Sequence, residues 1–215
     1  MPIGMKKIII GISILVYSNI GVSQKRNDLI DFKKINLKFL DSLIFEEAMK
    51  ERKKVNLSRM VHDDNCSKTA KYQAEYCSNY NELTHVNNKP YLGSLLKEPN
   101  NRFEFYVNKS KSKLEYTINM EIIMQYKKIN TTNYTNLISK TYEDCAKSII
   151  MSFMSSESHK ESVIFEMDEF GKMHGEYKSY YNTKTDCLTT TGFFVLVYEN
   201  QNHHIRKKYY LLSDF

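Results

Sequence analysis

Six consecutive apolar residues, Phe193 to Tyr198, constrain the fold of this chain most strongly. A strand with one face in water alternates apolar and polar residues, so a strand that is apolar throughout must be covered on both faces. The run therefore predicts a central strand. Helical patterns come mainly early in the chain and strand patterns mainly late. This order favours an α+β or three-layer sandwich fold over a doubly wound parallel sheet.

Three segments have the apolar spacing of helices that pack by one face. They are Asn36 to about Lys53, Asp63 or Asp64 to about Tyr80, and Tyr142 to Met154. An aspartate at the start of the second segment can cap its first turn, and acidic residues favour the start of the third. The inward stripe of the second helix comprises Cys66, Ala70, Ala74 and Cys77.

Segments rich in β-branched and aromatic residues predict the strands. They are Ser162 to Met167, Met173 to Tyr181, Thr191 to Glu199 and Ile205 to Leu212. Leu114 to Met124 predicts a strand or a short helix. Residues 87–112 are rich in Asn, Lys, Pro and Ser, so we expect a loop-rich insertion there, with a short strand at Phe103 to Val107.

The N-terminus has the pattern of a cleavable signal peptide. Two lysines precede a short apolar run, Ile8 to Val16, and small residues follow it. We expect residues 1–23 to be removed by cleavage between Ser23 and Gln24, with an uncleaved anchor or a buried strand as the alternative. The mature chain, 24–215, is then expected to be exported, either secreted or periplasmic.

Charge and length limit the partners of the mature chain. The whole chain has a formal net charge of +6, and its basic residues are scattered rather than gathered in a stripe with aromatic residues. We therefore expect no nucleic-acid partner. No later apolar segment is long enough for a transmembrane helix. The length suits a single domain, and the sequence leaves the oligomeric state open.

Four cysteines lie in the mature part: Cys66, Cys77, Cys145 and Cys187. Export to an oxidising compartment makes all four disulfide candidates, and two bridges can form. Cys66 and Cys77 cannot bridge each other, because eleven helical residues separate them by about 16 Å. Buried free thiols are the alternative. Without a C-x-x-C pair, the spacing excludes zinc-ribbon and thioredoxin motifs.

Two stretches of the chain resemble a known family. Ala48 to His85 resembles the first half of a bacterial CAP domain, from the cysteine-rich secretory, antigen 5 and pathogenesis-related group. The family has an N-x-x-R helix end, a D-x-x-L-x-x-x-A-x-x-x-A helix and then a histidine. The matching positions here are Arg52, Asp63, Cys66, Ala70, Ala74 and His85.

The second stretch, Thr141 to Ile164, resembles the family's helix that ends in W-x-x-S-x-x-H-x-x-x-I. Phe153, Ser156, His159 and Val163 occupy those positions. Between the two stretches, Glu121 matches the glutamate of the family's G-E-N-I motif. The resemblance covers a core of about residues 37–199.

The resemblance implies an α-β-α sandwich with a central, mainly antiparallel sheet. It also implies a surface cleft lined by two histidines and two glutamates, of which His85, Glu121 and His159 hold three places. The fourth place is open, with Glu143 and Glu157 the nearest candidates. By this reasoning His85 and His159 are candidate ligands for zinc or another divalent cation. Without the resemblance, His85 is a solvent-facing histidine and His159 fixes a turn.

For function, the resemblance implies an extracellular binding module that holds a small or lipid-like ligand, or a divalent metal, in this cleft. The alternative is a metal-assisted hydrolase or protease with Glu121 as its base, and a purely structural surface role needs no site. We favour the module without catalysis, because fold alone does not establish chemistry. The remaining histidines are expected to be structural or exposed: His62, His174, His203 and His204.

Overall fold

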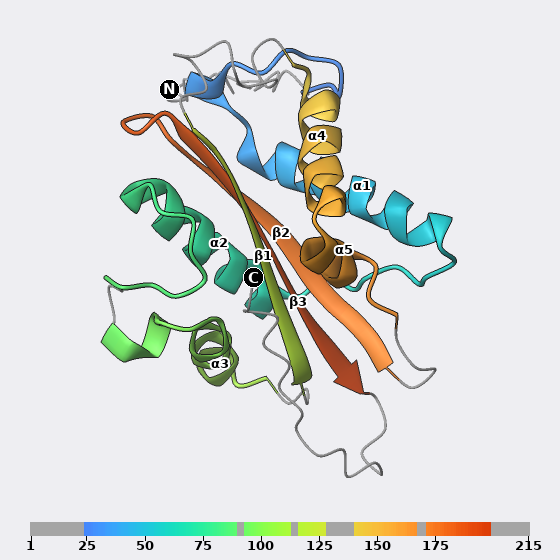
Figure 1. The fold of residues 1–215 in the computed structure, drawn as a ribbon, viewed down its shortest axis with the longest axis vertical. Helices are drawn as coiled ribbons and strands as arrows, with labels where there is room; N and C mark the ends of the chain where they lie inside the picture. The colour runs from blue at the N-terminus through green and yellow to red at the C-terminus, as the bar shows by residue number, and fades with distance from the viewer. Residues whose placement is uncertain (1–23, 90–92, 113–115, 128–139, 167–170, 199–215) are drawn as a thin grey trace, which may run out of the picture.

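The computed structural model describes residues 24–89, 93–112, 116–127, 140–166 and 171–198. Within these residues, a long twisted sheet separates two layers of helices (Figure 1). The arrangement is the three-layer α+β sandwich that the sequence predicted.

The sheet consists, in the described residues, of β1 (Tyr116–Lys127), β2 (Gly171–Asn182) and β3 (Cys187–Tyr198). The strand order is β1-β3-β2 and both pairings are antiparallel. β3 is therefore the central strand, as its apolar run predicted. Its Phe194 packs into the larger core, whereas Phe193 packs into a smaller cluster on the opposite face.

One helical layer contains α1 (Leu37–Lys54), α4 (Tyr142–Ser155) and the short α5 (Glu157–Val163). The sequence predicted the bounds of α1 and α4 to within one or two residues. The Asn36 side chain caps α1 by accepting a hydrogen bond from the Phe39 N–H.

Arg52 fixes the end of α1. Its side chain is fully buried, and burial lowers its pKa. Its Nε donates to the Ser58 carbonyl at 2.9 Å, and its Nη1 donates to the Val163 carbonyl at 3.0 Å. These bonds join α1 to the connector that follows it and to the end of α5.

The other layer contains α2 (Asp64–Tyr80) and α3 (Pro99–Ser110). Asp63 caps α2 by accepting hydrogen bonds from the N–H groups of Asn65 and Cys66. The predicted stripe of α2 is buried throughout.

Two predicted strands are wrong. Phe103 to Val107 lies inside α3, because residues four apart share one helical face and both ends of this segment pack against the Phe193 cluster. Ser162 to Val163 belongs to α5, where the Ser162 hydroxyl donates to the Ser158 carbonyl one turn earlier. Leu114 to Met124, predicted as a strand or a short helix, is a strand from Tyr116 onward, in β1. The predicted strand at 205–212 and the signal at 1–23 lie outside the described residues.

The cysteines correct the disulfide expectation. All four are free and buried. Two of them, Cys66 and Cys77, lie on α2, and Cys187 is the first residue of β3. Cys145 lies on α4 and packs into the larger core. The prediction that Cys66 and Cys77 do not bridge each other is confirmed. Each thiol occupies a small apolar or hydrogen-bonded position, which is the alternative that the inward stripe allowed.

Candidate functional site

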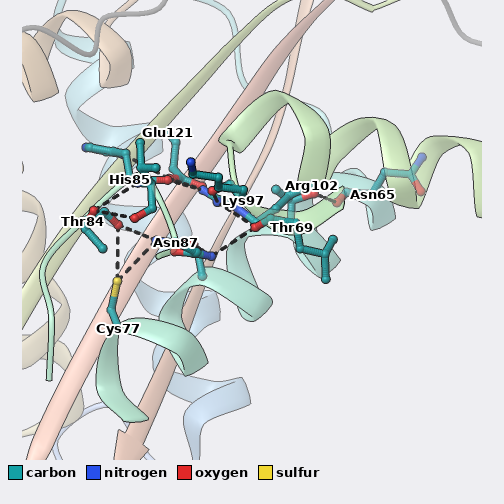
Figure 2. Close-up of polar contacts among 12 residues, drawn as sticks. Asn65, Thr69, Cys77, Thr84, His85, Asn87, Lys97, Arg102 and Glu121 are labelled. Carbon is teal, nitrogen blue, oxygen red and sulfur yellow. Dashed lines mark hydrogen bonds and ion pairs between the residues drawn. The ribbon is translucent and has the colours of Figure 1, made fainter. Parts of the chain in front are cut away.

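His85 lies just after α2, in a segment held in place by buried amide side chains. The helix ends at Asn81, which adopts a left-handed conformation with φ 54°. Gln73 on α2 donates a hydrogen bond to the Thr84 carbonyl. Asn87 donates to Gln73 Oε1 at 2.9 Å, and its backbone N–H donates to the Lys97 carbonyl. These bonds fix the backbone on both sides of His85 (Figure 2).

Glu121 projects from the middle of β1, opposite Phe193 of β3, on the face that α2 and α3 cover. Its side chain is 2% exposed, and His85 Nδ1 lies 3.0 Å from its Oε1. An ionised carboxylate only accepts hydrogen bonds, so Nδ1 carries the proton in this contact. In the neutral ring, Nε2 is therefore an acceptor, and the His85 side chain is 33% exposed.

Arg102 completes the group, which we call the His–Glu–Arg cluster: His85, Glu121 and Arg102. Its Nη2 donates to Glu121 Oε1 at 2.8 Å, to Glu121 Oε2 at 2.7 Å and to the His85 carbonyl at 3.1 Å. Its Nη1 donates to the Lys97 carbonyl at 2.8 Å. The Arg102 side chain is 0% exposed. A buried ion pair with these hydrogen bonds is strongly held, because removing either charge leaves the other unpaired.

The sequence did not predict Arg102, because it lies in the segment interpreted as a loop-rich insertion. The signal was present, since Pro99 is suited to the first turn of a helix and Phe103 and Val107 follow at helical spacing. That pattern would have placed Arg102 on a helix, but it would not have predicted that Arg102 pairs with Glu121.

His159 lies in α5 and stacks edge-on against Phe153 of α4, with ring centroids 5.6 Å apart. Burial lowers its pKa, and the charge of His85 lowers it further. His159 and His85 come from opposite helical layers, on α5 and just after α2. α5, which carries His159, contacts β1, the strand that carries Glu121, and β1 is an edge strand among the described residues.

Both candidates for the second glutamate lie in the first turn of a helix. Glu143 pairs with Lys147, four residues later on α4, at 2.8 Å. Glu157 is exposed in the first turn of α5. The Ser156 and Ser158 hydroxyl oxygens lie 3.4 Å from each other. Within the described residues, no recorded hydrogen bond joins either serine to His159.

The other described histidines have structural or exposed positions, as predicted. His62 stacks on Phe45 at 4.1 Å and contacts Glu176 Oε1 through its Nδ1, with its side chain 68% exposed. His174 lies in β2, with Nδ1 3.5 Å from Asp63 Oδ2. His203 and His204 lie outside the described residues.

The donor set does not fit the divalent cation that the resemblance implies. In the part of the chain that the structure describes, no group of three or more His, Cys, Asp or Glu side chains is placed to hold a metal ion. Both oxygens of Glu121 already accept hydrogen bonds from a guanidinium. A metal at this carboxylate would lie directly beside the positive charge of Arg102.

The chain is thus a three-layer α+β domain in which the His–Glu–Arg cluster lies on β1, at the edge of the described sheet. The chain belongs to the cysteine-rich secretory protein family, CAP, whose model matches residues 47–164. A comparison with curated proteins found no match.

Solved structures similar to this chain include an outer surface protein and an extracellular protein of bacteria. An outer surface protein from Borrelia burgdorferi has a TM-score of 0.50 and 19% identity, covering 79% of this chain and 97% of that chain. It supports the fold. An extracellular protein containing a SCP domain from Bacillus anthracis has a TM-score of 0.46 and 13% identity. That match covers 74% of this chain and 40% of the other. None of the described helices has the length and apolar character needed to cross a membrane.

Proposed function

We propose that this chain is an exported, extracellular binding module that works without catalysis. Its site would be the cleft implied by the family, with His85 and His159 exposed to the ligand and Glu121 behind His85. Export is supported by the signal-like N-terminus and by a family described as secretory.

One observation carries the preference for binding over hydrolysis. Glu121 is 2% exposed and fully paired with Arg102, so its carboxylate is unsuited to act as a base or to bind a metal. A hydrolase needs a reachable base together with a nucleophile or an activated water. The partly exposed imidazoles remain available, and a neutral imidazole offers one donor and one acceptor to a ligand.

The ligand class that we propose is a small amphiphile, such as a fatty acid or a sterol, whose polar end contacts the imidazoles. The family resemblance suggests this class, and the imidazoles provide hydrogen bonds suited to a hydroxyl or a carboxyl group. The hydrolase alternative rests on the His85–Glu121 contact, because a carboxylate that orients an imidazole is also found in catalytic bases.

The experiment titrates mature protein with a fluorescent fatty acid and a fluorescent sterol, and assays ester and peptide libraries for turnover. We expect saturable binding that His85→Ala or His159→Ala weakens about three- to tenfold, the effect of one lost hydrogen bond. His62→Ala is the matched control, since this exposed histidine contacts Glu176 on β2 instead. Turnover that H85A abolishes and H62A retains would establish the hydrolase. Absence of saturable binding would refute the proposed ligand class.

A further inference from the structure

Arg102 reaches Glu121 from a segment in which the sequence showed no motif of the family. It comes from α3, in the segment between the two resembling stretches. Its guanidinium contacts the carboxylate and also the carbonyl of His85, so one group touches both members of the implied site (Figure 2). A metal cation at this site would also have to bind the Glu121 carboxylate beside His85.

The position of Arg102 is fixed by the packing of α3. Phe103 stacks on Phe193 of β3 with centroids 5.2 Å apart and meets Tyr116 of β1 edge-on at 4.8 Å. The backbone N–H of Arg102 donates to the Glu98 carbonyl at 3.0 Å. Its Nη1 is held by the Lys97 carbonyl at 2.8 Å and lies 3.4 Å from the Leu96 carbonyl. The guanidinium therefore cannot leave Glu121 without also breaking the hydrogen bonds that its Nη1 and Nη2 donate to backbone carbonyls.

The charges explain why a metal is excluded. One carboxylate and one guanidinium, both almost completely buried, already balance. A divalent cation would add two positive charges beside an existing one, in a place where water screens poorly. Neutral imidazoles supply ligand atoms but no negative charge.

We propose that Arg102 is a built-in substitute for the divalent cation, so that this site is permanently filled by a side chain and works independently of metal. The inference deepens the proposed binding function, because it rests on the same site, but it does not depend on which ligand binds. It assigns α3 a role: the helix delivers the internal cation and orients His85 through Glu121.

The test compares mature wild-type protein with Arg102→Met and Arg102→Lys, each stripped of metal and titrated with zinc chloride by calorimetry. We expect R102M to bind zinc roughly tenfold tighter than wild type, or more, because Glu121 becomes an unpaired carboxylate beside His85. R102K keeps a positive charge and should behave like wild type. Equal zinc affinities in wild type and folded R102M would overturn the inference.

Two further variants show where the zinc binds. Adding Glu121→Gln to R102M should abolish the gain, since the charge that attracts the metal is lost. Adding His62→Ala should leave it unchanged, because His62 contacts Glu176 on β2 rather than the cluster. A gain that H62A removes and E121Q retains would contradict the assignment.

Loss of the ion pair can also destabilise R102M, so thermal unfolding is measured with and without zinc. Zinc should raise the midpoint of R102M and leave that of wild type unchanged. If R102M does not fold, the effect of zinc on wild type is decisive. Zinc that raises the thermal unfolding midpoint of wild type but not that of E121Q would refute the inference. An unchanged midpoint of wild type would support it. The binding function is tested separately, by the titrations of mature protein with a fluorescent fatty acid and a fluorescent sterol.

Discussion

Asp41 provides the sharpest test of the energetics of this fold. It lies on α1, and its side chain is buried against β2. Its Oδ1 accepts a hydrogen bond from the Ser179 N–H at 2.8 Å, and its Oδ2 lies 3.8 Å from Lys178 Nζ. Burial raises the pKa of Asp41 from 3.8 to about 7, although Lys178 and Ser179 act in the opposite direction. The nearby Glu176 raises it further.

The shift sets both the sign and the size of a pH effect. The unfolded chain releases this proton near pH 4, whereas the folded chain keeps it to about pH 7. Between these values the folded state binds more protons, so the free energy of unfolding falls as pH rises. Above about pH 7 the contribution of Asp41 to the free energy of unfolding no longer changes with pH. At about 1.4 kcal/mol for each pKa unit, the ionised carboxylate lowers the stability by roughly 4 kcal/mol above pH 7.

The substitution Asp41→Asn removes the titration and keeps an oxygen to accept the Ser179 hydrogen bond. Lys178 retains Glu176 Oε2 at 3.5 Å. We expect D41N to be more stable than wild type by up to about 4 kcal/mol near pH 8, and similar to it near pH 4. Urea unfolding followed by circular dichroism at several pH values measures this. Glu51→Gln is the control, because Glu51 lies on the same helix and pairs with Lys54 at 2.7 Å.

A lower stability of D41N than of wild type near pH 8 would show that the ionised Asp41 carboxylate does not destabilise the fold. If D41N kept the fall in stability between about pH 4 and pH 7, a group other than Asp41 would cause that fall.

Three other predictions follow from the structure and sequence. Arg52→Leu should lower the free energy of unfolding by about 3 kcal/mol, because the Ser58 and Val163 carbonyls lose their donor; an unchanged urea midpoint would contradict this. The four cysteines should resist a thiol reagent in the native protein at pH 8 and all react after unfolding, since burial raises the pKa of each, that of Cys145 to about 12; fewer than four thiols would reveal a disulfide. The exported protein should begin at Gln24 by intact mass, and a chain that starts at Met1 would disprove the cleavage.

The sequence predicted the architecture well where the pattern was long or the cap was explicit. The apolar run in β3 identified the central strand, and Asn36 and Asp63 marked the starts of two helices. Short aromatic segments were ambiguous. Phe103 to Val107 has the composition of a strand, and its packing against β3 confirms the helical period that Pro99 and the spacing of Phe103 and Val107 also indicate.

The candidate site was predicted only in part, because its chemistry depends on a contact between distant segments. Motif matching selected His85 and Glu121, which lie 3.0 Å apart through Nδ1 and Oε1. It could not select Arg102, since no local pattern indicates which buried carboxylate an arginine will meet. The cysteines illustrate the same limit, because export suggests bridges whereas all four thiols are free and buried, with Cys66, Cys77 and Cys145 in three different clusters of the core.

The most direct test of a site without metal is a crystal of the wild-type protein soaked in zinc chloride and measured at the zinc absorption edge. We expect the Arg102 guanidinium on both oxygens of Glu121, with no anomalous peak between His85 and His159. A zinc peak bonded to Glu121, with Arg102 displaced from the carboxylate, would contradict it.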